Sequence, residues 1–356
     1  MANYAASVLA KGQTLVTQKY QAPEQRRKIP TVMEMALKNQ KISIPNAQDL
    51  RLSPLRTVDV NFLTNIAAGS ATAKVAAHTG TYGDSAKINV VYVTHVETMS
   101  LPRKLAYNDI HSYQDLFNNL FEMKWKNLRT RQDTSALAFL LSNRCQLDKT
   151  VINPQVASAG FSDTSVIGSW DNTNFAGLIT AAEKARFIQW AKAFMAARLY
   201  TGPYDIVADL QLAAQFEYQL NQGQGNAANT SFQFGDAAIA ATQDAVSSFY
   251  PQGSALVMPQ GTLAGLTWNE GLNKAGVNAG ENSVGSLGTV ADPLGSGAIA
   301  DISMYTARAD TSANSTGGST QDIVDQWELA LTIGYVTPPL STASDSVIHL
   351  FGQSAS

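Results

Sequence analysis

The sequence predicts an α+β protein with one very long helix, several long strands and a separate helix–strand–helix region. Apolar residues between Ser112 and Arg144 recur every three or four positions, and charged residues mark the opposite side, which is typical of an amphipathic helix. Asp325–Tyr335 alternates apolar and polar residues and therefore predicts a strand with one buried face. With 356 residues, 45% of them apolar, the chain can form two or three domains with real cores.

The long helix has a clear start and a clear end. Ser112 and Asp115 have the spacing of a capping box, and no Gly or Pro interrupts the pattern before Asn143–Cys145. At 1.5 Å per residue the helix would be about 50 Å long and could cross a whole domain. Its second half, Ala136–Leu141, is apolar almost all round, so we expect that end to be enclosed by other elements.

The net charge of −3 conceals two oppositely charged halves. Residues 1–150 contain 19 Lys and Arg against 11 Asp and Glu, whereas residues 151–356 contain 6 against 17. This division favours contact between the basic half of one copy and the acidic half of another, or attraction of the basic half to a polyanion. Pairing of the two halves within one monomer fits the counts equally well.

Other bulk features argue against export and membrane insertion. The first ten residues lack the basic and apolar regions of a signal peptide, and no segment is long and apolar enough to span a membrane. Cys145 is the single cysteine, so neither an internal disulfide nor a cysteine metal cluster is possible. We expect no cofactor and no metal.

Residues 1–56 resemble an extended arm more than a domain. Four prolines interrupt this segment, its apolar residues are scattered, and only Thr31–Gln40 predicts a short helix. Arg26, Arg27 and Lys28 form a compact basic cluster in an arm that has nine Lys and Arg against three Asp and Glu. Such an arm should seek an acidic neighbour or a nucleic acid, and it needs another surface for its stability.

The next residues predict a long two-stranded hairpin. Val58, Val60 and Phe62 alternate with polar residues, and Lys87–Val96 is rich in β-branched residues with a period of two. Ala67–Ser85 between them consists largely of Ala, Gly, Thr and Ser and predicts a flexible tip. Because a two-stranded hairpin is marginally stable alone, it should pack on its own domain or reach another subunit.

The remaining chain predicts a mixed α/β region followed by returning strands. A helix with Thr180 and Glu183 in capping-box positions ends at Gly202-Pro203, and a second helix from Asp209 to Leu220 follows a buried strand. The other predicted elements are short strands and turns in 151–170, a polar loop in 223–233, an ambiguous stretch in 237–249, a strand–turn–strand unit in 255–268, a long exposed loop in 271–300, and strands in 302–308, 326–336 and 347–351.

No motif in the sequence indicates catalysis. Gly223, Gly225 and Ala228 have dinucleotide-loop spacing but follow a helix, so a polar loop explains them better. The histidines at 78, 95, 111 and 349 lack metal-ligand spacing and are interpreted as surface or strand residues, and Cys145 is interpreted as a small buried hydrophobe.

Two groups of carboxylates allow an alternative. Asp205 and Asp209 flank a strand, where a turn residue and a helix N-cap are the simpler interpretation. Asp322, Asp325 and Glu328 cluster before another strand, where a solvated strand entry is the simpler interpretation. A carboxylate enzyme using Asp205, Asp209 or Glu217 stays open as a hypothesis, and a deep pocket that gathers them would support it.

The order of these parts resembles the major capsid proteins of tailed bacteriophages, which have the HK97 fold. The segments that carry the resemblance are Gly80–Ser85 before the second hairpin strand, Ala255–Thr262 leading to Trp268, and Gln326–Leu329. The implied divisions are an N-terminal arm (1–56), an extended hairpin loop (57–100), a spine helix with the peripheral domain (101–177), an axial α/β domain (178–300), and strands that return to the peripheral and axial domains (301–356).

The resemblance implies a structural protein that assembles with itself into pentamers and hexamers of an icosahedral shell around double-stranded DNA. It also implies a separate scaffolding protein, a portal, non-specific DNA contact, no membrane, and a place in the virion capsid after assembly in the host cytoplasm. The residues expected at subunit interfaces are Arg26, Arg27, Lys28, Lys74, Tyr82 and Lys87. Lys74 and Lys87 lie where some relatives form a lysine cross-link, although nothing in the sequence identifies the partner of such a bond. A cellular nanocompartment shell shares the fold and is the main alternative.

Overall fold

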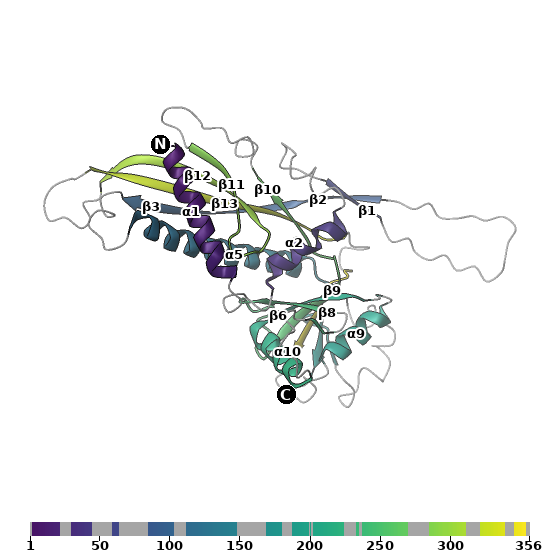
Figure 1. The fold of residues 1–356 in the computed structure, drawn as a ribbon. Helices are drawn as coiled ribbons and strands as arrows, with labels where there is room; N and C mark the ends of the chain where they lie inside the picture. The colour runs from purple at the N-terminus through teal and green to yellow at the C-terminus, as the bar shows by residue number, and fades with distance from the viewer. Residues whose placement is uncertain are drawn as a thin grey trace, which may run out of the picture.

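The computed structural model describes residues 2–21, 30–44, 59–63, 85–102, 112–147, 169–179, 187–198, 200, 202–223, 233–234, 237–269, 285–310, 321–338 and 345–353. These residues form an elongated body and a smaller lower domain, each built on its own β-sheet (Figure 1). The N-terminus lies on the body and the C-terminal strand lies in the lower domain. No helix among the described residues is long and apolar enough to cross a membrane.

The body sheet has five antiparallel strands centred on the long strand β13 (Gln321–Val336). One side of β13 pairs with β12 (Ile299–Asp310) and then with β10 (Ala264–Trp268), and β11 (Gly285–Ala291) pairs with β12. The other side pairs with β3 (Val91–Pro102), whose partners span both of those ladders. The alternation predicted in β13 is confirmed around Trp327 and Leu329, which are buried on one face between exposed or half-buried neighbours, whereas all residues of 331–336 are buried, so this end of the strand is covered on both faces.

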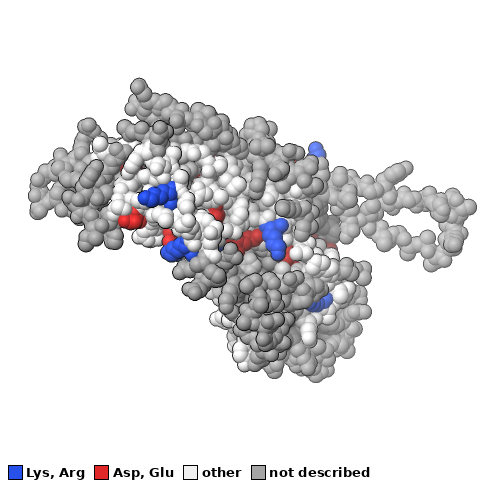
Figure 2. Space-filling view, viewed as in Figure 1, with Lys and Arg blue, Asp and Glu red and all other residues white. Residues whose placement is uncertain are grey.

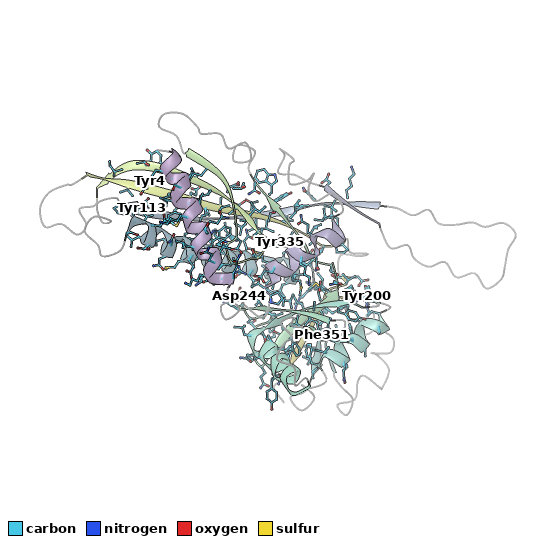
Figure 3. The ribbon with its side chains drawn as sticks, viewed as in Figure 1. Tyr4, Tyr113, Tyr200, Asp244, Tyr335 and Phe351 are labelled. Carbon is cyan, nitrogen blue, oxygen red and sulfur yellow. The ribbon has the colours of Figure 1, made fainter. Side chains whose placement is uncertain are left out.

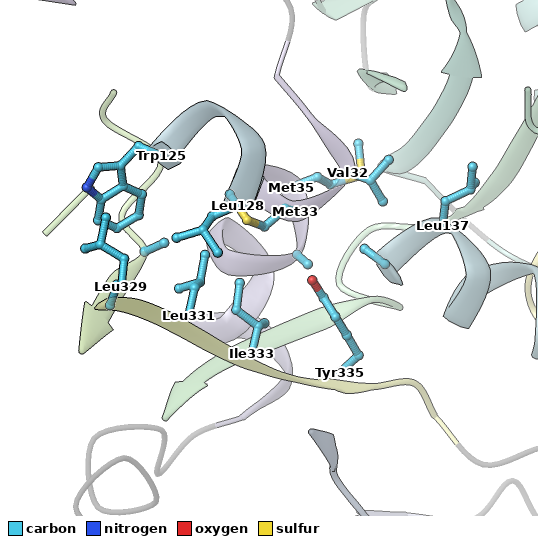
Figure 4. Close-up of a cluster of buried hydrophobic side chains, with 14 of the residues drawn as sticks. Val32, Met33, Met35, Trp125, Leu128, Leu137, Leu329, Leu331, Ile333 and Tyr335 are labelled. Atoms are coloured by element: carbon cyan, nitrogen blue, oxygen red, sulfur yellow. The ribbon is translucent and has the colours of Figure 1, made fainter. Parts of the chain in front are cut away.

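The long helix α5 (Tyr113–Ser142) lies along that buried face and confirms the predicted spine. Ser112 is its N-cap and forms the predicted capping box with Asp115. Figure 4 shows side chains of α5, β13 and helix α2 (Val32–Ser43) interleaved in one cluster. In Ala136–Leu141 one face is buried, whereas Ala138 is exposed, so this end is covered on one side and not enclosed.

Helix α1 (Ala2–Gln21) differs from the extended conformation that the sequence predicts for this region. It buries a stripe of small or short side chains against α5, namely Ala5, Val8, Leu9, Gly12 and Val16. A Cβ atom built on Gly12 would lie 2.7 Å from the Phe117 ring, so the two helices approach closely there. The predicted helix within the arm is confirmed by α2, which Thr31 caps with a capping box to Glu34.

The predicted hairpin is confirmed by two antiparallel strands, β1 (Asp59–Leu63) and β2 (Ser85–Asn89). The residues that join them, 64–84, lie outside the described residues. The strand predicted as one piece from Lys87 to Val96 changes partner at Val90, because β2 pairs with β1 and β3 pairs with β13. The ribbon projects beyond the body (Figure 1).

The lower domain holds a mixed seven-stranded sheet in the order β4-β5-β14-β9-β6-β8-β7. Its strands are β4 (Ser169–Asp171), β5 (Ala176–Ile179), β6 (Tyr204–Asp209), β7 (Gln233–Phe234), β8 (Ala237–Thr242), β9 (Ser254–Pro259) and β14 (His349–Gln353). Helices α9 (Phe187–Ala197) and α10 (Leu210–Gly223) confirm the predicted helix–strand–helix order around β6. Phe351 of β14 lies within this domain (Figure 3).

Two parts of the chain differ from their predictions. The glycine-rich stretch expected as a long loop contains strand β11, and Asp292 after it is buried. The predicted strand–turn–strand unit is present, but its strands β9 and β10 belong to different sheets, so the turn at 260–263 joins the lower domain to the body. Residues 264–300, expected in the axial range, thus supply strands to the body sheet.

Candidate subunit interface

A polar cavity of about 740 Å³ lies where the body, the N-terminal helices and the lower domain meet. It is lined by residues from the end of α1, the start of α2, the middle of α5, the segment after β8 and the turn after β11. The charged residues among them are Glu34, Lys126, Arg129, Asp133, Asp244 and Asp292. In Figure 2 positive and negative side chains alternate across this face of the molecule.

Internal contacts occupy these charged groups. Arg129 of α5 forms ion pairs with Glu34 of α2 and, at 3.5 Å, with Asp292. Asp133 accepts a hydrogen bond from the backbone N–H of Met33 at 3.1 Å, where a carboxylate also complements the N-terminus of α2. These charged residues of the cavity wall therefore join separate elements of the fold, and their role is structural.

Glu122 of α5 makes the contacts that attach helix α1, as Arg129 and Asp133 do for α2. Lys19 and Lys126 donate to its two oxygens at 2.8 and 2.7 Å, and the Tyr20 hydroxyl also donates to it. Burial alone would raise the pKa of Glu122, but these hydrogen bonds outweigh it and lower that pKa to about 2. Glu122 is thus ionised at neutral pH and attaches the end of α1 to α5.

Asp205 joins helix α2 to the lower domain. Its carboxylate is 1% exposed and accepts from Asn39 Nδ2 at 2.6 Å and from the Gly261 N–H at 3.2 Å. Burial raises the pKa of Asp205, and the hydrogen bonds from Asn39 and Gly261 oppose that effect. Asp205 therefore connects strand β6 to helix α2 and to the turn at Gly261, and its role is to hold these elements together.

Asp209 has the role of the predicted N-cap. It accepts from the N–H of Leu212 at 2.9 Å and from the N–H of Ser254 at 2.6 Å. Asp205 and Asp209 occupy opposite ends of β6, and neither is among the residues that line the polar cavity. The side chain of Glu217 lies outside the described residues. The structure does not bring the three carboxylates of the enzyme hypothesis together in that cavity.

The second predicted carboxylate group is also divided. Asp325 is fully buried and accepts from the Tyr113 hydroxyl and from Thr306 Oγ1, both at 2.9 Å, so it is not the solvated residue that the sequence predicts. Glu328 on the same strand is exposed. The side chain of Asp322 is outside the described residues.

The histidines and the cysteine are structural where they are described. His95 of β3 contacts Ser135 Oγ at 2.9 Å, and His349 of β14 is fully buried beside the Phe194 ring. Burial, together with the nearby Arg198, lowers the pKa of His349 to about 3, so this ring is neutral at physiological pH. Cys145 is buried, as predicted, and His78 and His111 lie outside the described residues. The described residues contain no group of three or more His, Cys, Asp or Glu that could hold a metal ion.

Of the interface residues expected from the resemblance, the structure places Lys87. It is exposed on β2, opposite Asn61 of β1. Arg26, Arg27, Lys28, Lys74 and Tyr82 lie outside the described residues, as do the Gly225–Ala228 pattern and the tip of the hairpin.

Comparison with known proteins gives matches among solved structures. No protein-family model matches the chain, and no curated protein matches it. The fold is similar to that of phage capsids. A structure from Mycobacterium phage Che8 has 11% identity and a TM-score of 0.48, with 91% of each chain covered. The capsid structure of the cyanophage P-SCSP1u has 10% identity and a TM-score of 0.42 over 84% of each chain, and the capsid of Ralstonia phage GP4 has 11% identity and a TM-score of 0.38 over 83% of this chain and 82% of the other.

No local sequence pattern identifies the residues that attach the N-terminal helices. Asn39, Glu122 and Arg129 carry no motif, because each acts through a partner about 95 or more positions away. The one available signal was the spacing of Ala5, Val8 and Leu9, which predicts a helix with a buried stripe.

Proposed function

We propose that this chain is the major capsid protein of a tailed phage and forms an icosahedral shell around double-stranded DNA. The observation that carries the proposal is the extended body. A 30-residue helix lies along a five-stranded sheet, and a two-stranded ribbon projects from it beside a separate α/β domain. A ribbon of this kind is marginal alone and gains stability when a neighbour covers it.

In this proposal the function is assembly, and its mechanism is many weak contacts per subunit. Each subunit would contact its neighbours through the ribbon, the N-terminal region and the lower domain, so that dissociation requires several contacts to break together. The subunits would form pentamers and hexamers with the help of a separate scaffolding protein and a portal, and they would contact DNA non-specifically through charge.

Arg26, Arg27 and Lys28 are proposed as an electrostatic clamp to a neighbouring subunit or to the genome. The excess of basic residues in 1–150 and of acidic residues in 151–356 supports this role. Reversing all three charges to Glu should leave the monomer folded and weaken the association constant between subunits about tenfold, equivalent to about 1.4 kcal/mol of association free energy, and so reduce the assembled fraction at a given concentration. Size-exclusion chromatography with light scattering measures that fraction.

The control reverses another exposed charge of the same region, Lys11→Glu on α1. It should assemble nearly as well as the unmodified chain. Equal assembly of the triple variant would remove the clamp from the proposal, while a chain that stays monomeric even with scaffold would remove the capsid function itself.

A further inference from the structure

Strand β14 gives the sheet of the lower domain its continuity. It lies between β5, to which it is parallel, and β9, to which it is antiparallel. Among the described residues β14 is the strand that joins the β4–β5 pair to the other four strands of this sheet. A change that loosens β14 would therefore divide the sheet into two parts.

His349 is the first residue of β14, and it is fully buried. The centre of the Phe194 ring lies 5.1 Å from the centre of the imidazole, and the centre of the Tyr200 ring lies 6.4 Å from it. Neither imidazole nitrogen has a hydrogen-bond partner in the part of the chain that the structure describes. The surroundings of His349 therefore suit a neutral ring and offer no acceptor to a charged one.

A positive charge already lies beside His349. Arg198 directly follows helix α9 and forms an ion pair with Asp345, with 2.8 Å between Nη2 and Oδ1. The Asp345 carboxylate is thus engaged by Arg198. Within the described residues, a second cation at His349 would lie next to Arg198 without a counter-ion of its own.

The other titratable groups near the ring do not supply that counter-ion. Cys145 donates its backbone N–H to the Ile348 carbonyl at 2.8 Å. Burial raises the pKa of the Cys145 thiol and the pKa of the Tyr200 hydroxyl, so both groups are neutral below pH 7. Strands β5 and β9 on either side contain no titratable residue, and the one charged residue of α9 is another cation, Lys192.

We propose that His349 makes the lower domain acid-sensitive, because protonation of its imidazole releases β14 from its place between β5 and β9. The neutral ring fits its aromatic surroundings, whereas the cation requires water or an acceptor that the folded domain does not provide. Release of β14 brings the ring into contact with solvent and separates the β4–β5 pair from the rest of the sheet. This property belongs to the folded chain itself and does not depend on the proposed shell function.

The direction of the pH effect follows from the linkage between protonation and folding. Burial and Arg198 lower the pKa of His349 in the folded chain to about 3, whereas a histidine in an unfolded chain has a pKa of about 6.5. Folding therefore favours the neutral ring. Its contribution to the free energy of unfolding is complete above the unfolded pKa and is lost as pH falls toward the folded pKa. Between pH 7 and pH 5 the population of the open form should rise about 25-fold.

Hydrogen exchange on the unassembled full chain at pH 7, 6 and 5 measures this population, once the rates are corrected for the pH dependence of chemical exchange. The amides of β9 and β14 should lose about 25-fold in protection between pH 7 and pH 5. Those of α5 and β13 in the body should change by less than about threefold. Most carboxyl groups contribute little in this interval, because their unfolded pKa values lie near 4.

Two variants identify the group that titrates. His349→Leu has an apolar side chain of similar size, and His349→Gln has a polar side chain that does not titrate. In both, the protection of β9 and β14 should stay within about threefold from pH 7 to pH 5, whatever its level at pH 7. Any contribution of Asp205 is common to all the proteins compared and cancels.

His95→Gln is the matched control. His95 is a partly buried histidine of the body that contacts Ser135, so its replacement should leave the pH response of β9 and β14 as it is in the unmodified chain.

Three results would overturn the proposal. The first is equal protection of β14 at pH 7 and pH 5 in the unmodified chain, and this measurement needs no variant to fold. The second is a pH response that persists in a His349 variant, since another group would then cause it. The third is an equal loss of protection in the body and the lower domain, which would indicate global unfolding in place of a selective release of β14.

Discussion

The lower domain and the N-terminal helices bury similar apolar side chains against different kinds of partner. The lower domain forms one core between one face of its sheet and helices α9 and α10, with Phe351 among the aromatic rings at its centre, while the opposite face of the sheet belongs to the core of the body. Helices α1 and α2 instead bury Ala5, Met33 and their neighbours in a core that α5 and β13 dominate. The first region has a core of its own on one face of its sheet, whereas the second has no core without a surface supplied by other elements.

This difference predicts that substitutions in the core of the lower domain and substitutions under the N-terminal helices destabilise different parts of the chain. The following changes test whether the two regions respond separately, in order of decreasing effect.

Phe351→Ala should have the largest effect and should act on the lower domain. The ring contacts Trp190 and Phe194 at centroid distances of 5.1 and 5.4 Å. Removing such a buried ring costs about 3–5 kcal/mol of unfolding free energy. Denaturant unfolding followed by hydrogen exchange should show loss of protection in β6, β9 and β14, with α1 unchanged. An equal loss in α1 would mean that the two regions unfold together.

Gly12→Leu should release α1 and leave the lower domain intact. The new side chain would overlap the Phe117 ring, because even a Cβ atom would lie 2.7 Å from it. Overpacking of this kind costs about 1–3 kcal/mol. Limited proteolysis within residues 2–21 should become faster. Ala6→Leu, on the exposed side of the same helix, is the matched control and should be neutral.

Asn39→Ala should weaken the attachment of α2 to the lower domain in a pH-dependent manner. It removes the donor to Asp205 and leaves a buried carboxylate less satisfied, at a cost of about 1–3 kcal/mol at neutral pH. The folded-state pKa of Asp205 is already raised, so folding favours the protonated form of this carboxyl group. The resulting contribution to the free energy of unfolding is present at low pH and is lost as pH rises through the folded-state pKa.

The destabilisation by Asn39→Ala should therefore shrink as pH falls through the raised folded-state pKa of Asp205, because a protonated carboxyl group depends less on the Asn39 donor and the unfolded chain titrates alike in both proteins. Urea unfolding of both proteins between pH 3 and pH 7 measures it. A difference that stays constant with pH would show that Asn39 does not act through the ionised carboxylate.

Glu122→Gln should have the smallest effect. It removes the charge that Lys19 and Lys126 contact, but both lysines are half exposed, so solvent screening limits the loss to about 0.5–1 kcal/mol. The depressed pKa of Glu122 means that its contribution is present above the unfolded pKa of about 4.3 and is lost as pH falls toward 2. Added salt should reduce the difference between variant and parent, and a salt-independent difference would contradict an ion-pair role.

The sequence predicted the elements whose signal is local and strong. The capping box at Ser112 and the alternation around Trp327 both specify an element from a few neighbouring residues, and both are confirmed. Helix α1 was missed because its buried stripe consists of weak hydrophobes such as Ala5 and Gly12, which few periodicity criteria count. Strand β11 was missed because its glycines suggested a loop, although β12 provides the pairing that stabilises it.

The contacts that attach the elements to one another could not be predicted. The bond between Asn39 and Asp205 joins residues 166 positions apart, and the change of sheet between β9 and β10 is decided by partners far along the chain. No local spacing encodes such contacts. All the interface residues stay predictions: Arg26–Lys28, Lys74 and Tyr82 lie outside the described residues, and Lys87 is exposed in a single copy of the chain.

Electron microscopy of the purified full chain, expressed with and without its scaffolding protein, tests the central claim most directly. We predict closed icosahedral particles, or pentamers and hexamers, in which the β1–β2 ribbon of one subunit lies on the body of the next. A monodisperse monomer under both conditions would contradict the claim. Particles in which the ribbon contacts only its own subunit would contradict the part of it that assigns assembly to this ribbon.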